Sequence, residues 1–78
     1  MSENQYESIV SHLAILNGKP CVKGTRVSVE HVLDHLASGW SIAAIIENYP
    51  NVTASGVSAC IAYARDVVAG EAVFPNAA

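Results

Sequence analysis

The segment NGKPCVKGTRVSV, residues 17–29, contains three of the chain's four cationic side chains, Lys19, Lys23 and Arg26. It also contains two glycines and a proline, residue types that set the direction of the backbone. A segment of this composition is either a turn that serves the fold or a site that binds an anion. As a site, it offers charge-assisted hydrogen bonds to phosphates or carboxylates. A plainer interpretation is that Arg26 pairs with Glu30, as neighbouring surface residues often do.

Two histidines, His31 and His35, have the spacing of paired metal ligands on one helix. Glu30 and Asp34 lie beside them, and the sequence shows no third or fourth ligand. A solvated polar face is therefore the favoured interpretation, and no metal is expected. His12 is isolated and indicates no site.

Neither catalysis nor nucleotide binding is expected. Residues 18–20 and 23–26 superficially resemble phosphate-binding loops but lack the spacing of glycines, lysine and hydroxyl residue that such loops need. No local pattern supplies a nucleophile with a base and an orienting group. Cys21 and Cys60 form neither a metal-type pair nor a disulfide framework, and are expected to be small buried hydrophobic residues. We therefore predict a protein without enzymatic activity and without a cofactor.

Helices are expected to position most of these residues, because apolar side chains recur at helical spacing from residue 28 onward. The pattern predicts helices over about 29–38, 42–48 and 54–69. Gly39 and Pro50 suit the ends of the first two helices. The apolar stripe of the third helix is expected to comprise Val57, Cys60, Ile61, Ala64, Val67 and Val68.

Each helix begins with the same signature. Ser28, Ser41 and Thr53 suit the N-cap position, where a hydroxyl accepts a hydrogen bond from a helical N–H. An apolar residue precedes each cap and a second follows five positions later, which is the spacing of a hydrophobic staple. The expected staple pairs are Val27 with Val32, Trp40 with Ile45, and Val52 with Val57.

The second and third helices, joined by a short turn and braced by the first helix, form a helix-turn-helix arrangement. A helix that reads a DNA groove usually presents several cationic or amide side chains, whereas this one has a single arginine beside an aspartate. A scaffold that binds protein without binding DNA is therefore the alternative. The residues expected to face outward are Ser55, Ser58, Ala59, Ala62, Arg65 and Asp66.

Upstream of residue 28 the pattern favours extended chain. Ile9-Val10 and Cys21-Val22 are short strand candidates, and Pro20 restricts any strand there to the edge of a sheet. We predict a small β-ribbon or extended arm over residues 8–27. The fold class is therefore mainly α, with three helices and a short N-terminal ribbon or arm.

One domain is predicted over residues 8–70, between a flexible N-terminus at 1–7 and a flexible tail at 71–78. The hydrophobic content of 51% is high for a chain of 78 residues, which predicts that a second subunit covers part of it. A homodimer is expected, with strand edges available for pairing across a two-fold axis. The net charge of −3 argues against a general nucleic-acid coat. A polar, acidic N-terminus without an apolar span favours a cytoplasmic protein.

The stretch from Ile9 to about Val68 resembles a small bacterial family catalogued as domain of unknown function 433. Gly18-Lys19-Pro20, the run from Val22 to Val27, Val29, Ser38-Gly39 and Tyr49-Pro50 carry the resemblance. It implies a compact helix-turn-helix domain of homeodomain-like type. This chain departs from the family pattern at His12-Leu13, at Asn17 and at Ala54-Ser55-Gly56, where the third helix opens without charge.

The resemblance also implies a function. It suggests the antitoxin of a type II toxin-antitoxin pair that neutralises a PIN-like nuclease, and a DNA-binding regulator of its own operon. On that reading, Lys19, Lys23 and Arg26 meet DNA phosphates or the acidic metal-binding cluster of the nuclease. The third helix adds Ser55, Ser58 and Arg65 to the DNA- or partner-binding surface. The alternative is a protein-binding adaptor or dimerisation module without DNA binding.

Overall fold

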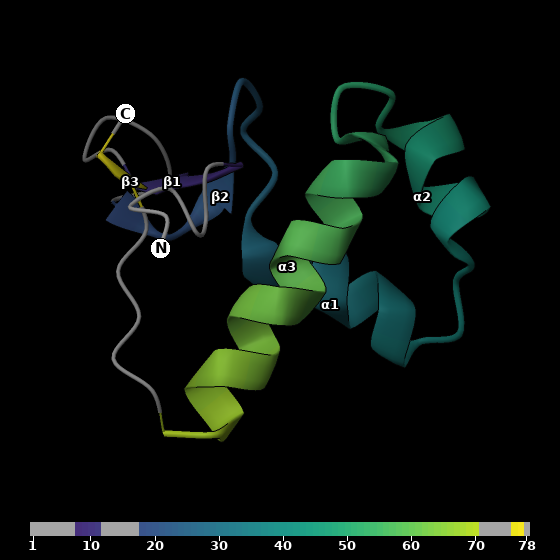
Figure 1. Cartoon of the computed structure of the whole chain (residues 1–78). Helices are drawn as coiled ribbons and strands as arrows, with labels where there is room; N and C mark the ends of the chain where they lie inside the picture. The colour runs from purple at the N-terminus through teal and green to yellow at the C-terminus, as the bar shows by residue number, and fades with distance from the viewer. Residues whose placement is uncertain (1–7, 12–17, 71–75, 78) are drawn as a thin grey trace.

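The computed structural model describes residues 8–11, 18–70 and 76–77, and it confirms a mainly α fold with a small ribbon (Figure 1). His12 and the N-terminus predicted to be flexible lie outside the described residues. The helices are α1 (Val29–Ala37), α2 (Ile42–Asn48) and α3 (Thr53–Val68). The strands are β1 (Ile9–Ser11), β2 (Cys21–Val22) and β3 (Asn76–Ala77). None of the described helices is both long and apolar enough to cross a bilayer.

The helices begin as the capping residues predict. Ser28 accepts a hydrogen bond from His31 N at 2.9 Å, and Ser41 accepts one from Ala44 N at 3.0 Å. The start of α3 differs, because Val52 occupies the N-cap position and its side chain makes no capping hydrogen bond. Thr53, with a φ of 64°, makes that bond instead, since its Oγ1 accepts from Gly56 N at 3.1 Å.

Helix α1 is terminated by a glycine in the left-handed conformation, as predicted. Gly39 has a φ of 95°, in the left-handed region that glycine adopts without steric cost. Its N–H donates to Leu36 O at 3.0 Å, and the next N–H, of Trp40, donates to His35 O at 3.0 Å. This pair of hydrogen bonds is a Schellman motif, which satisfies the last carbonyls of the helix. The motif fixes the direction in which the chain continues toward α2.

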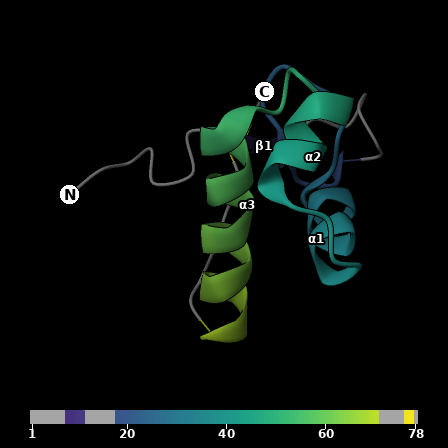
Figure 2. The same ribbon diagram turned by 90° about the vertical axis from the view of Figure 1, so that its right-hand side faces the viewer.

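The core lies where the three helices and the ribbon meet. All six predicted staple residues belong to it: Val32, Ile45, Val52 and Val57 are at most 1% exposed, and Val27 and Trp40 pack against them. In Figure 2, α2 lies level with the beginning of α3, while α1 lies lower along it. The staples therefore do more than set helix direction, because they also supply the side chains that join the helices.

The second half of α3 corrects two predictions about its faces. Ile61, Val67 and Val68 were expected in the buried stripe but are 43%, 50% and 87% exposed. Asp66 was expected to face outward but is 7% exposed, and Ala59 packs against the core. The physical reason is that α2 flanks only the beginning of α3, so the contacting face changes along the helix (Figure 2).

The strands form a three-stranded sheet in the order β2-β1-β3. β1 and β2 are antiparallel, with Ile9 opposite Val22, and this confirms the predicted ribbon. β2 is an edge strand, as Pro20 required. Its outer side is bonded to the chain itself, because Val22 N donates to Val27 O at 2.9 Å. That edge is therefore not free to pair with a second copy.

The third strand was not predicted. Asn76 and Ala77 lie in the segment expected to be a flexible tail, yet they pair in parallel with Val10 and Ser11 of β1. A two-residue strand has no periodicity of its own to recognise. Its position depends on the free edge of β1, which only the folded ribbon provides.

The ribbon approaches α3 most closely at Gly56. This glycine is buried in the first turns of α3, and a Cβ placed on it would lie 3.1 Å from Val22 Cγ1. Real side chains rarely pack that tightly. The absence of a side chain at this position therefore lets β2 lie against the helix.

Both cysteines are buried and unbonded, which confirms that they act as small hydrophobic residues. Burial raises the pKa of the Cys60 thiol to about 12, and it also raises the pKa of Cys21. Because the thiolate is the reactive species, we expect native protein to resist iodoacetamide near pH 8. Mass spectrometry is expected to find no adduct on native protein and two adducts per chain after unfolding in urea. Rapid labelling of native protein would contradict the buried placement.

Candidate functional site

The turn that connects β2 to α1 is held by hydrogen bonds between its own residues. Thr25 Oγ1 donates to Val22 O at 2.8 Å and accepts from Val27 N at 2.9 Å. Thr25 N also donates to Val22 O at 3.0 Å, and Gly24 has a φ of 78°. A β-carbon at Gly24 would be disfavoured in this conformation. Gly24 and Thr25 therefore fix the backbone of the turn between the two cationic residues.

Lys23 and Arg26 are exposed on this turn, and we call residues 23–26 the cationic turn. The backbone N–H of Lys23 donates to Ser8 O at 2.7 Å, which ties the turn to the ribbon. In the part of the chain that the structure describes, neither side chain takes part in an ion pair. The cationic turn thus presents two positive charges that no carboxylate of the described residues compensates.

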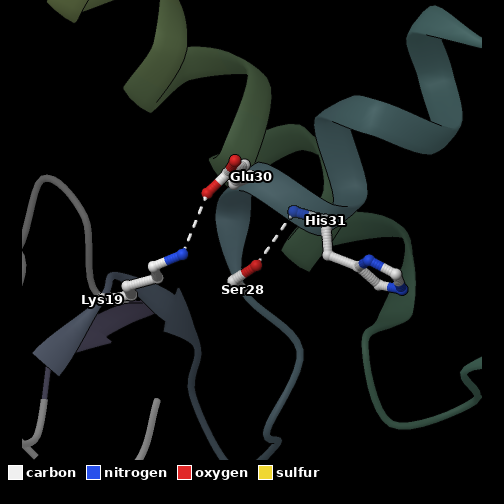
Figure 3. A network of polar contacts seen from close by, with 4 residues as sticks. All are labelled: Lys19, Ser28, Glu30 and His31. Atoms are coloured by element: carbon white, nitrogen blue, oxygen red, sulfur yellow. Dashed lines mark hydrogen bonds and ion pairs between the residues drawn. The ribbon is translucent and has the colours of Figure 1, made fainter. Parts of the chain in front are cut away.

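Lys19 lies apart from the cationic turn, at the opposite end of β2. Its Nζ is 3.4 Å from Oε1 of Glu30 in the first turn of α1 (Figure 3). The plainer interpretation paired Arg26 with Glu30, but among the described residues Glu30 pairs with Lys19 and Arg26 forms no ion pair. Both side chains of the pair are largely exposed, at 62% and 79%, so it contributes little to stability. Lys19 is a weaker candidate for anion binding than Lys23 or Arg26.

The outward side of α3 carries the other predicted contact residues. Ser55, Ser58 and Arg65 are all exposed. Arg65 Nε lies 2.9 Å from Oδ1 of Asp66, so a carboxylate compensates its charge. This side of α3 is polar and nearly neutral, in contrast to the cationic turn.

A second cluster joins α1 to the end of α2. His31 Nε2 lies 3.0 Å and His35 Nε2 lies 3.3 Å from the hydroxyl oxygen of Tyr49. The ring of Trp40 stacks on His35, with centroids 4.1 Å apart. The prediction of a solvated polar face is therefore incomplete, because both histidines form hydrogen bonds with the residue that follows α2. The sequence gave no signal of this contact.

Trp40 holds this cluster against the core, which gives a stability prediction. We expect Trp40→Ala to lower the free energy of unfolding by about 1–3 kcal/mol through lost apolar burial. For a domain of this size, that lowers the melting temperature by about 4–8 °C per kcal/mol. Thermal unfolding followed by circular dichroism measures the change. Trp40→Phe is the matched control and should lose less, and an unchanged melting temperature for Trp40→Ala would show that the ring adds nothing to the fold.

A shallow apolar groove of about 400 Å³ lies between the beginning of α1 and the second half of α3. Lys19 and Glu30 also line it, so their ion pair borders an otherwise apolar surface. Val67 and Val68, which were predicted to be buried but are exposed, form part of its wall. The remaining apolar lining is Pro20, Val29, Leu33, Tyr63 and Ala64.

The model of a family described as "Protein of unknown function (DUF433)" matches residues 9–64. No curated protein and no solved structure matches the chain. The matched region begins at β1 and includes the cationic turn, the histidine cluster and most of α3.

Proposed function

This chain belongs to the DUF433 family, and because that family has no known function, we propose one from the chain's own surfaces. We propose that it is a non-enzymatic antitoxin that binds and neutralises a PIN-like nuclease, and that it also binds DNA to regulate its own operon. The cationic turn is the observation that carries the proposal. It suits a contact with anionic groups of a partner, whether carboxylates or phosphates.

The case for a nuclease partner begins with Arg26. A planar guanidinium engages a carboxylate through two parallel hydrogen bonds, and the metal site of a PIN-like nuclease is a cluster of carboxylates. Because hydrogen bonds of Thr25 fix the turn, little backbone conformational entropy is lost when Arg26 binds. An arginine held in this way would compete with the catalytic metal ions of the nuclease. Such competition is the proposed means of neutralisation.

The case for DNA is built on the same turn. Helices α2 and α3 form the helix-turn-helix, and Ser55 and Ser58 lie exposed near the beginning of α3. Arg65 is compensated by Asp66, so α3 itself offers little attraction for phosphate. Lys23 and Arg26 would supply most of that attraction. Binding is therefore expected to be weak in general and to weaken with salt by about one counterion for each phosphate contact.

Two assays on purified protein test the proposal. The first measures RNA cleavage by a PIN-like nuclease encoded beside this gene, with and without the protein. The second is an electrophoretic shift assay on the DNA upstream of the gene, with unrelated DNA of equal length as the control. Inhibition of cleavage together with a sequence-dependent shift supports both roles. If neither cleavage nor DNA mobility changes, the proposal is wrong.

The alternative is a protein-binding adaptor without a DNA role. The apolar groove and the exposed Ile61, Val67 and Val68 favour it, because exposed apolar side chains gathered on one helix suit a protein partner better than phosphate. A stable complex with a protein partner, combined with no shift of any DNA, would select this alternative.

A further inference from the structure

We propose that His31 and His35 form a binding site for a divalent transition-metal cation of the copper, nickel and zinc class, with the hydroxyl oxygen of Tyr49 beside it. The proposal is independent of the antitoxin role. It starts from the convergence of both Nε2 atoms on one oxygen, at 3.0 Å and 3.3 Å. A pair of imidazole nitrogens that point to the same place is the arrangement that such a cation needs.

The fold holds the two ligands in place from several sides. His31 and His35 are one helical turn apart on α1, so they share a side of the helix, and their ring centroids are 4.5 Å apart. Ser28 caps α1 at its start through the backbone N–H of His31 (Figure 3). Trp40 stacks on the ring of His35 at 4.1 Å, which restricts its rotation. Little ordering is therefore needed before a cation binds.

Cation binding requires one histidine to change its tautomer. A tyrosine hydroxyl has one proton, so it can donate to only one of the two Nε2 atoms. The other Nε2 must then carry a proton and donate to the tyrosine oxygen, so in this tautomer it has no lone pair for a cation. When that histidine changes to its Nδ1–H tautomer, the proton lies on Nδ1, and a cation between the rings would accept a lone pair from both Nε2 atoms. The Tyr49 oxygen would lie close enough to serve as an oxygen ligand or to bind a coordinated water.

The donor types decide which cations fit. Imidazole nitrogen suits copper, nickel and zinc, whereas magnesium and calcium prefer oxygen ligands. Among the residues that the structure describes, no group of three or more histidine, cysteine, aspartate or glutamate side chains could hold a metal. Water would therefore complete the coordination, and binding should be weaker than at a four-ligand structural zinc site. Affinity is expected to rise from nickel to copper, following the general order for divalent cations.

Trp40 provides a direct probe, because it is the chain's only tryptophan and its ring contacts a proposed ligand. Protein without a polyhistidine tag is titrated with NiCl₂ and, separately, with CuCl₂, while tryptophan fluorescence is recorded. We expect saturable quenching with one cation per chain, and no quenching by MgCl₂. Tyr49→Phe removes only the hydroxyl and is expected to weaken binding about tenfold or more.

Histidine variants distinguish this site from general surface binding. His31→Gln is expected to abolish saturable quenching, and it leaves the ring that stacks on Trp40 in place. His12→Gln is the matched control, since it removes the chain's third histidine and should leave the titration unchanged. Circular dichroism verifies that each variant is folded. Wild-type protein without saturable quenching, or a folded His31→Gln variant that titrates like wild type, would overturn the proposal.

Discussion

Charge reversal on the cationic turn, by Lys23→Glu and Arg26→Glu together, is expected to weaken binding to the proposed nuclease partner or the proposed DNA site by at least about 100-fold. Each charge-assisted hydrogen bond contributes about 1.5–3 kcal/mol, and about 1.4 kcal/mol corresponds to a tenfold change in affinity. The fold should be unaffected, because both side chains are exposed and, among the described residues, neither is in an ion pair. Titration calorimetry on the nuclease and shift assays on DNA measure the two affinities.

The matched control is Lys19→Glu. It reverses a lysine of the same segment that Glu30 already compensates, and its effect on binding should therefore be much smaller. For DNA, single alanine variants at Lys23 and Arg26 should each reduce the salt dependence of binding by about one counterion. A double variant that folds and binds both partners normally would show that the turn has only a structural role.

The largest effect on stability is expected from Gly56→Val. A Cβ at this position already lies 3.1 Å from Val22 Cγ1, and valine adds two further methyl groups near β2. Overpacking of this kind costs about 1–3 kcal/mol, and the branched side chain is also restricted within a helix. We expect a loss near the upper end of that range, which lowers the melting temperature by about 10–20 °C.

Ala54→Val serves as the control for helix propensity, because Ala54 is exposed on the same turn of α3. Its melting temperature should fall by no more than a few degrees. Gly56→Ala is an intermediate case, since the gain in helix propensity opposes a tight contact with Val22. A Gly56→Val protein as stable as wild type would mean that the ribbon can move away from α3 without cost.

The sequence by itself determined the helices and their ends. Ser28 and Ser41 cap the first two helices through bonds to residues three positions away, and Gly39 closes α1 through bonds to residues of its last turn. The ribbon also followed from local pattern, because β-branched residues lie in β1 and β2, and Pro20 comes just before the edge strand β2. Interactions within one or two turns depend mainly on residue type and spacing, which a sequence displays directly.

The candidate site was predicted in part. The cationic turn could be recognised from composition, since Gly24 and Thr25 are residues that shape a turn and lysine and arginine flank them. The sequence did not indicate that Lys19 pairs with Glu30, eleven positions away, because either Lys19 or Arg26 could have reached that carboxylate. Only the direction in which β2 leads into α1 decides between the two.

The remaining features depend on how the elements pack. His31 and His35 meet Tyr49 across 18 and 14 positions of sequence, and Asn76 pairs with a strand at the opposite end of the chain. Asp66 is buried, and Ile61, Val67 and Val68 are exposed, because the neighbours of α3 change along its length. Helical spacing shows which residues share a face, but the relative placement of helices and strands decides which face is covered. That placement depends on contacts summed over the whole core, so only the tertiary structure could decide it.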